Sequence, residues 1–154
     1  HFRLREVPFK RVLSLLRQHG YAKNLHPQHA EQILNGLMHG YVDLIVEAEQ
    51  GFFVLDYKTN WLGPSRAHYQ TQQLQLAMEH HHYDLQYLIY LTALHRFLGQ
   101  RLQHYDASQH LGSDHYLFLR GMSPGTGHHG VYSHQPELDL IVQLDQLFDG
   151  QDLA

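Results

Sequence analysis

The alternation of apolar and polar positions in the first forty residues predicts one strand, one helix and a further apolar segment. Residues 2–9 partly alternate and predict a strand, which Pro8 confines to the edge of a sheet. Apolar residues then recur at helical spacing from 11 to 19, and Gly20 is expected to end this helix. A polar connection separates the helix from four apolar residues between positions 33 and 38.

The second half of the chain is expected to form helices, short strands and a glycine-rich loop. The expected segments are a helix-tolerant stretch over 66–80, a long helix over 83–98 followed by Gly99, a strand over 116–119, a loop over 121–130, a strand at 131–132 and a helix over 138–148. No repeat or linker divides the chain. We therefore expect one α/β domain over residues 1–154, with a mixed central sheet flanked by helices.

Two segments between these halves predict an antiparallel hairpin, because both are rich in β-branched and aromatic residues. The strands are expected over 40–47 and 52–58, joined by a short polar connection. A loop centred between residues 49 and 50 places Asp43 directly opposite Asp56, with Cβ atoms about 4.5–5.5 Å apart. Lys58 projects from the same face because strand side chains alternate. The opposite face is expected to pack on the core through Leu44, Val46, Phe53 and Leu55.

Two aspartates that face each other repel, unless a cation lies between them or one is protonated. Hard oxygen ligands in a chain without thiols favour Mg²⁺ or Mn²⁺, and the carbonyl of Tyr57 can add a third oxygen. Lys58 can then orient a water or neutralise charge on a phosphate, so that Asp43, Asp56 and Lys58 fit phosphodiester hydrolysis. From the pattern alone, a solvated Asp–Lys cluster on an ordinary strand pair remains the alternative.

The long predicted helix adds a second candidate element. Gln86 and Tyr90 are spaced i, i+4 and share a face, which Tyr83 adjoins. Such a stripe can meet a phosphate or stack on a base. Half-buried tyrosines with their hydroxyls at the rim of the core are the alternative interpretation.

Composition and charge limit the possible chemistry. The chain has 154 residues and no cysteine, which excludes disulfides, thiolate metal sites and cysteine nucleophiles. The net charge is −4, with ten basic and eight acidic residues through Gln103 and one basic and seven acidic residues after it. An anionic substrate is therefore expected on the first two-thirds of the chain. The sixteen histidines can add positive charge as pH falls toward about 6.5, and compositional drift on a wet surface is the alternative interpretation. No apolar run is long enough to span a membrane.

Four runs of residues, taken together, resemble the C-terminal nuclease domain of the RecB family, in the PD-(D/E)XK superfamily. They are Gly40-Tyr41-Val42-Asp43-Leu44, Leu55-Asp56-Tyr57-Lys58-Thr59-Asn60-Trp61-Leu62-Gly63, Tyr83-Asp84-Leu85-Gln86-Tyr87 with Tyr90, and Tyr116-Leu117-Phe118-Leu119-Arg120-Gly121. The resemblance implies a restriction-endonuclease-like fold, in which a mixed sheet is flanked by helices. It also implies DNA cleavage that depends on a divalent metal.

By this resemblance Asp43, Asp56 and the Tyr57 carbonyl bind the metal and Lys58 is the catalytic lysine. Gln86 and Tyr90 match the family's Q-x-x-x-Y motif beside the active site. The family carries a further metal-ligating histidine upstream of the position that corresponds to residue 1, and nothing in this chain matches it. The ATP-dependent helicase portion of the family is also absent from these residues.

The resulting expectation is a Mg²⁺-dependent exodeoxyribonuclease domain that acts in double-strand-break repair. Because the chain begins at His1, we expect it to be a fragment of a longer helicase–nuclease. The resemblance implies DNA as substrate, RecC-like and RecD-like subunits and RecA as partners, a cytoplasmic location and no membrane association. A catalytically silent domain of the same fold, used for docking or regulation, is the alternative function.

Overall fold

The computed structural model of the chain describes residues 1–23, 25, 28, 31–125 and 127–153. Two sheets are present in this part of the chain. The smaller one pairs β1 (Phe2–Pro8) with β2 (Ile33–Met38), and the larger one has the strand order β3-β4-β5-β6. Its strands are β3 (Leu44–Ala48), β4 (Gly51–Lys58), β5 (Leu111–Phe118) and β6 (Val131–His134). The mixed α/β class that we expected is confirmed.

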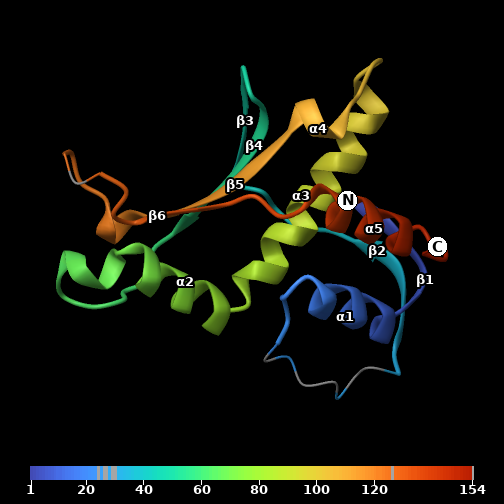
Figure 1. Cartoon of the computed structure of the whole chain (residues 1–154), viewed down its shortest axis with the longest axis horizontal. Helices are drawn as coiled ribbons and strands as arrows, with labels where there is room; N and C mark the ends of the chain where they lie inside the picture. Colours follow the sequence, from blue (N-terminus) through green and yellow to red (C-terminus); the bar gives the residue numbers. More distant parts are fainter. Residues whose placement is uncertain (24, 26–27, 29–30, 126, 154) are drawn as a thin grey trace.

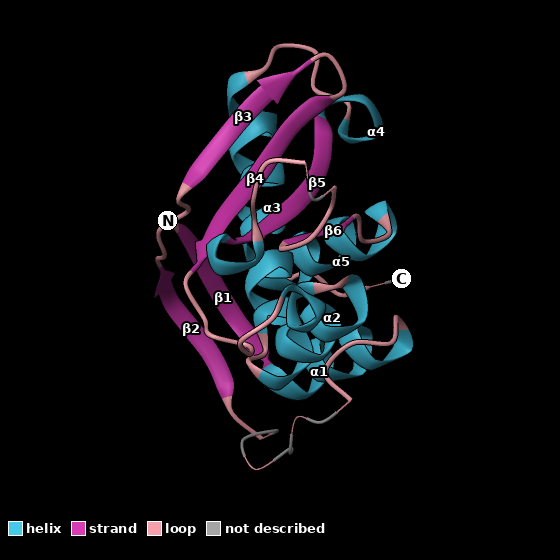
Figure 2. Ribbon diagram, turned by 90° about the vertical axis from the view of Figure 1, so that its left-hand side faces the viewer, coloured by secondary structure: helices cyan, strands magenta, loops and turns pink. Residues whose placement is uncertain are grey.

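Helices separate and cover the two sheets. The bounds are α1 (Phe9–Gln18), α2 (Thr71–His80), α3 (Tyr83–Arg101), α4 (Ala107–His110) and α5 (Leu138–Phe148), with the short 3-10 helices η1 (Arg66–Tyr69) and η2 (Leu119–Gly121). Helix α3 runs through the middle of the molecule, between the larger sheet and the group formed by α1, α5 and the smaller sheet (Figure 1). In Figure 2 the sheets form one side of the molecule and most helices the other.

The apolar faces of the helices meet in one core. Helix α1 buries the side predicted from its apolar spacing, and α3 contacts both α5 and β5. The largest fully buried apolar side chains come from α2, α3, α5 and the strands; they are Leu74, Met78, Tyr87, Leu88, Leu91, Tyr116, Phe118, Leu140, Ile141, Leu144 and Leu147.

The register predicted for the hairpin is confirmed. Strands β3 and β4 are antiparallel, and Leu44 pairs with Leu55 as the loop position requires. Gly51 starts β4 at a φ of +115°, a backbone conformation that glycine adopts without a steric penalty. Strand β3 begins later than expected, so Asp43 lies one residue before the ladder.

Our prediction of which face of the hairpin packs on the core was wrong. Val54 is fully buried and Asp56 is 4% exposed, whereas Leu44, on the other face, is 40% exposed. The prediction assigned the apolar face to the core, but α3 covers the face that carries the polar residues. The Lys58 ammonium can be placed there because Gln86 on α3 accepts a hydrogen bond from it and the ring of Tyr116 on β5 lies against it.

Several boundaries also differ from the sequence prediction, and one short helix was not predicted. Helix α3 continues through Gly99 to Arg101, because this glycine keeps a helical backbone and does not act as a left-handed cap. Strand β5 starts at Leu111, five residues earlier than expected, and the short helix α4 before it was not predicted. The closing helix has the predicted bounds.

Candidate active site

Strand β4 supplies a carboxylate and an ammonium group on its buried face. Asp56 and Lys58 are two residues apart, so both side chains project toward α3. They form an ion pair through Asp56 Oδ2 and Lys58 Nζ, with the Asp56 side chain 6% exposed and the Lys58 side chain 11% exposed. A charge pair this far from water is costly unless further polar contacts support it.

Aromatic rings and an amide supply that support around Lys58. The ammonium nitrogen lies 4.1 Å from the ring centroid of Tyr83 and 4.9 Å from that of Tyr116. It also donates a 3.1 Å hydrogen bond to Gln86 Oε1. Cation–π contacts are strongest when the cation is withdrawn from water, so these partners hold the ammonium in one position.

A chain of hydrogen bonds extends from Gln86 along α3. Tyr116 donates its hydroxyl proton to Gln86 Oε1 at 3.1 Å, and Gln86 Nε2 donates to the Tyr90 hydroxyl at 2.9 Å. Tyr90 in turn donates to the backbone carbonyl of Tyr41 at 2.7 Å. The i, i+4 stripe of α3 is thereby fixed against the segment that leads into β3.

Asp43 approaches the same place from the start of β3. Its Oδ2 atom accepts a 2.8 Å hydrogen bond from the backbone N–H of Tyr57, and the residue is exposed. Burial raises the pKa of Tyr90, the hydrogen bond from Gln86 lowers it, and the charges of Asp56 and Asp43 raise it further. Because Tyr57 lies between Asp56 and Lys58 in the chain, its hydrogen bond to Asp43 brings the second carboxylate to the part of β4 that carries the ion pair. The structure brings Asp43, Asp56, Lys58, Gln86 and Tyr90 together, which is the set that the sequence analysis selected.

The donor set is suited to a hard divalent cation. Asp56 Oδ2 is buried, and within the described part of the chain the Lys58 ammonium is its one polar partner. Asp43 adds a second, exposed carboxylate, and Tyr57 adds its neighbouring backbone carbonyl. Among the described residues, no three His, Asp or Glu side chains converge on one point. Two carboxylates suffice for Mg²⁺, which keeps several of its water ligands in protein sites.

Tyr116 is a member of this site that the sequence analysis did not select. It is fully buried on β5, and its partner in the parallel ladder is Asp56. Nothing in the local sequence around Tyr116 shows this neighbour, because parallel pairing joins residues that lie far apart in the chain. Tyr83 was expected beside Gln86 on a helical face, and its ring lies against Lys58.

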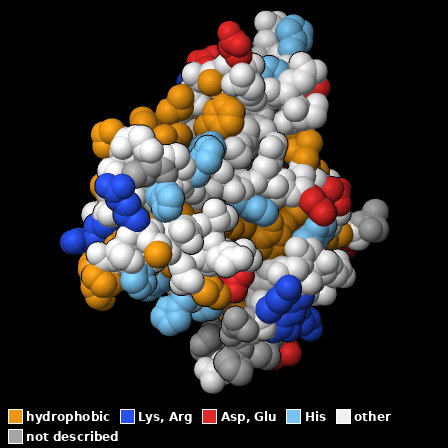
Figure 3. Space-filling model, turned by 60° about the vertical axis from the view of Figure 1, so that its left-hand side comes forward, with side chains coloured by type: hydrophobic (Ala, Val, Ile, Leu, Met, Phe, Trp, Pro, Cys, Tyr) orange, Lys and Arg blue, Asp and Glu red, His pale blue; other side chains and the backbone are white. Residues whose placement is uncertain are grey.

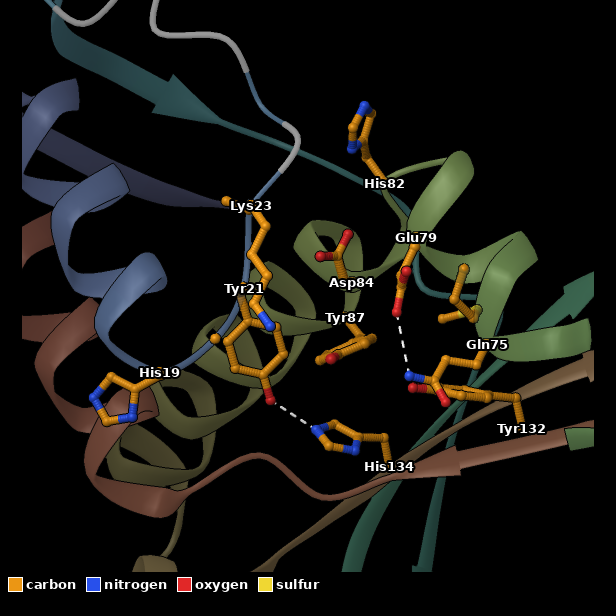
Figure 4. Close-up of a pocket in the computed structure, with 13 residues that line it drawn as sticks. His19, Tyr21, Lys23, Gln75, Glu79, His82, Asp84, Tyr87, Tyr132 and His134 are labelled. Carbon is orange, nitrogen blue, oxygen red and sulfur yellow. Dashed lines mark hydrogen bonds between the residues drawn. The ribbon is translucent and has the colours of Figure 1, made fainter. Parts of the chain in front are cut away.

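A cavity of about 370 Å³ lies apart from these residues, lined by side chains from the segment after α1, from α2, from the start of α3 and from β6 (Figure 4). The Tyr21 hydroxyl and His134 Nε2 are joined by a 2.7 Å hydrogen bond, and Tyr87 lies next to them. Burial raises the pKa of Asp84, whose Oδ1 atom is buried and has no hydrogen-bond partner among the described residues. The residues that line this cavity include none of those selected from the sequence as catalytic.

The fold and the site together define a class of nuclease. A family model for the PD-(D/E)XK nuclease superfamily matches residues 3–149, and the chain belongs to this superfamily. The described residues include no helix that is long and apolar enough to span a membrane.

Among curated proteins, the chain is similar to the RecBCD enzyme subunit RecB of several bacteria. Identity is 41% over 120 residues with the protein of Escherichia coli (strain K12), which covers 78% of this chain and 10% of that protein. It is 43% over 118 residues with the protein of Haemophilus influenzae, covering 77% of this chain and 10% of that protein. With the protein of Mycolicibacterium smegmatis the identity is 44% over 131 residues, which covers 78% of this chain and 12% of that protein. The chain thus spans about a tenth of the length of these relatives.

Proposed function

We propose that this chain is the divalent-metal-dependent deoxyribonuclease domain of a RecB-like helicase–nuclease. The observation that carries the proposal is the buried Asp56–Lys58 pair, which lies beside Asp43 and is linked through Gln86 to Tyr90. Replacing a buried ion pair by apolar residues of similar size is often neutral or stabilising, so the Asp56–Lys58 pair is not explained by stability alone. Its placement is explained by a reaction that needs fixed charges at one point.

Each residue then has a distinct role. Asp43, Asp56 and the Tyr57 carbonyl would hold a magnesium ion, for which manganese can substitute. Such an ion supplies Lewis-acid polarisation of the phosphodiester and a water of lowered pKa. Lys58 orients the attacking water or neutralises charge that develops on the phosphate, and Gln86 keeps its ammonium in place. Tyr90 orders the Tyr41 backbone beside the bound strand.

The context of the reaction belongs to the same proposal. The relatives are named as RecB subunits of RecBCD enzymes, so we place this chain in a longer polypeptide that works with RecC-like and RecD-like subunits. In this context it degrades DNA ends as an exonuclease in the cytoplasm during double-strand-break repair, and ATP hydrolysis belongs to the helicase part. The acidic stretch after Gln103 is suited to a protein surface, such as RecA, better than to DNA.

A cleavage assay tests the proposal directly. The chain is incubated with a linear end-labelled oligonucleotide and Mg²⁺ or Mn²⁺, alongside the variants Lys58→Ala, Asp56→Asn and Lys10→Ala. Loss of one well-placed electrostatic group lowers the rate about 10²–10³-fold, so the first two variants should lose cleavage. Lys10 lies exposed on α1 and serves as the matched control.

Metal binding provides a second, independent readout. Titration calorimetry with Mn²⁺ should give weaker binding for Asp43→Asn and Asp56→Asn than for the unmodified chain. If the chain binds metal and neither Lys58→Ala nor Asp56→Asn cleaves DNA more slowly than the unmodified chain, the proposed active site is refuted. If neither cleavage nor metal binding is found, a catalytically silent domain of the same fold is favoured.

A further inference from the structure

The segment that leaves β4 is fixed on both sides of Trp61. Arg120 Nε donates a 2.8 Å hydrogen bond to the carbonyl of Thr59. The Asn60 side chain is within hydrogen-bond distance of the Tyr83 hydroxyl, with Nδ2 at 3.3 Å and Oδ1 at 3.4 Å. Since Tyr83 also covers Lys58, these contacts tie the segment to the candidate active site.

The residue after Trp61 is also held. The backbone N–H of Leu62 donates to the Tyr69 hydroxyl at 3.1 Å, and Tyr69 is buried. The same hydroxyl donates to the Asn60 carbonyl at 3.4 Å. The main chain before and after Trp61 is therefore anchored to the body of the protein.

The Trp61 side chain is nevertheless 66% exposed, and it is the only tryptophan of the chain. An indole in water on a fixed backbone forgoes the burial that usually stabilises this side chain. It presents a flat face next to the site at a low cost in conformational entropy, because its backbone is already ordered. Aromatic side chains in this position act as stacking platforms for unpaired bases.

The surroundings of Trp61 favour an anionic partner. No acidic residue occurs between Asp56 and Glu79 or between Asp114 and Glu137, although the whole chain has a net charge of −4. These two segments meet at one end of the larger sheet, where Gly130 N–H donates to the Tyr69 carbonyl at 2.9 Å. Their basic residues at this end, beyond the buried Lys58, are Arg66 and Arg120.

The exposed surface at this end of the larger sheet also carries basic side chains. Figure 3 brings the end forward and shows Lys, Arg, His and hydrophobic side chains close to one another. Arg120 is exposed, and its bond to Thr59 orients the guanidinium beside the end of β4. An oriented guanidinium is suited to a phosphate, and an adjacent indole is suited to a base.

We propose that Trp61 stacks on an unpaired nucleobase and that Arg120 contacts the phosphate backbone of the same DNA strand. Trp61 lies three residues beyond Lys58, which is at most about 10 Å along an extended chain. That distance corresponds to about three stacked nucleotides at ~3.4 Å each. The proposal rests on the proposed nuclease function and adds to it a residue that selects a single-stranded segment near the scissile phosphate.

The single tryptophan allows a direct test by its own fluorescence. The chain is titrated with an oligothymidylate in EDTA, so that binding is measured without cleavage, and with an abasic strand of the same length that keeps the phosphates. Stacking predicts strong quenching by the oligothymidylate and little by the abasic strand. Equal quenching by both strands, or none by either, overturns the proposal. A blunt duplex of the same length should also quench weakly, and quenching equal to that of the single strand contradicts the need for an unpaired base.

Variants test the two contacts separately, with binding followed by the anisotropy of a labelled strand. Trp61→Ala should weaken oligothymidylate binding about 5- to 150-fold, the range that base–aromatic stacking contributes. Affinity for the abasic strand should stay unchanged, and Trp61→Phe should keep most of the binding. Arg120→Gln should weaken both strands alike and reduce the salt dependence by about one phosphate contact. Phe97→Ala, which removes a half-exposed aromatic residue on α3, is the control.

The outcomes separate this proposal from the nuclease proposal. If the unmodified chain cleaves DNA and Trp61→Ala binds the oligothymidylate as tightly as the unmodified chain, the stacking role is refuted and the nuclease function stands. If Trp61 is quenched by base-containing strands but no cleavage occurs with either metal, the strand-binding surface stands and the catalytic assignment fails.

Discussion

Asp114 gives the sharpest prediction, because it is an acidic group in the core that the proposed reaction does not use. It lies on β5 and is fully buried, and neither carboxylate oxygen has a hydrogen-bond partner in the described structure. Its ladder partners are Val54 and His134. Burial raises the pKa of Asp114 to about 8, and its charge raises the pKa values of Tyr21, Tyr87 and Tyr132.

The direction of the effect on stability follows from this raised pKa. An unfolded aspartate has a pKa of about 3.9, so the folded state holds the proton more tightly than the unfolded state. The stabilisation is fully present below about pH 4 and is lost as pH rises through the folded pKa near 8. The slope is about 1.4 kcal/mol per pH unit, which gives a loss of about 4 kcal/mol between pH 4 and pH 7. Domains of this kind are stable by about 5–15 kcal/mol in total.

Asp114→Asn keeps the shape of the side chain and removes its charge. We expect the free energy of unfolding of the unmodified chain, relative to the variant, to fall by about 2.7 kcal/mol between pH 5 and pH 7. The measurement is urea unfolding followed by circular dichroism at a series of pH values. Asp152→Asn is the control, since the Asp152 side chain is 92% exposed. Parallel curves for the unmodified chain and Asp114→Asn would show that Asp114 is charged in the fold and refute the reasoning.

Three further predictions concern the polar layer between α3 and the larger sheet, which consists of Asp56, Lys58, Gln86, Asp114, Tyr116 and His134. Tyr116→Phe keeps the ring beside Lys58 but removes the donor to Gln86, and it should cost about 1 kcal/mol in urea unfolding; no loss would show that the hydroxyl is not bonded. Asp56→Asn leaves the Lys58 ammonium without its counter-ion and should cost about 3 kcal/mol without divalent metal; a gain in stability would contradict the buried pair. Burial lowers the pKa of His134, so its NMR titration midpoint should lie below 6.5, and the stability it contributes should be lost as pH falls through that midpoint; a midpoint above 6.5 would place a carboxylate beside a charged imidazole.

The hairpin that carries Asp56 and Lys58 could be predicted because its register depends on local information. A short loop fixes which residues pair, and the observed pairing of Leu44 with Leu55 follows from the position of that loop. The helix that carries Gln86 and Tyr90 could be predicted equally well, because these residues are four positions apart and therefore share one face of a helix. In both elements the conformation is determined by residues that are close together in the sequence.

The buried side of the hairpin could not be predicted in the same way. Apolar residues usually mark the core, and that rule selected the face of Leu44 and Leu55. The polar face is buried because Gln86, 28 residues beyond Lys58, accepts a hydrogen bond from its ammonium, and because Tyr116 on β5 bonds to Gln86 and covers the ammonium with its ring. The position of Tyr116 itself depends on parallel pairing with β4, for which the sequence carries no turn signal.

The composition of this buried face connects stability with function. Asp56 and Lys58 lie in one half of the polar layer, and Asp114 and His134 lie in the other, all on the side of the sheet that α3 covers. Apolar residues of similar size are often at least as stabilising as a buried ion pair, and burying a carboxyl group without a hydrogen-bond partner is costly. For Asp56 and Lys58 the proposed reaction explains the cost, because the rings and the amide around the ammonium fix it before a phosphate arrives. Asp114 has no such contact to the candidate site, and replacing it should therefore raise stability without lowering cleavage.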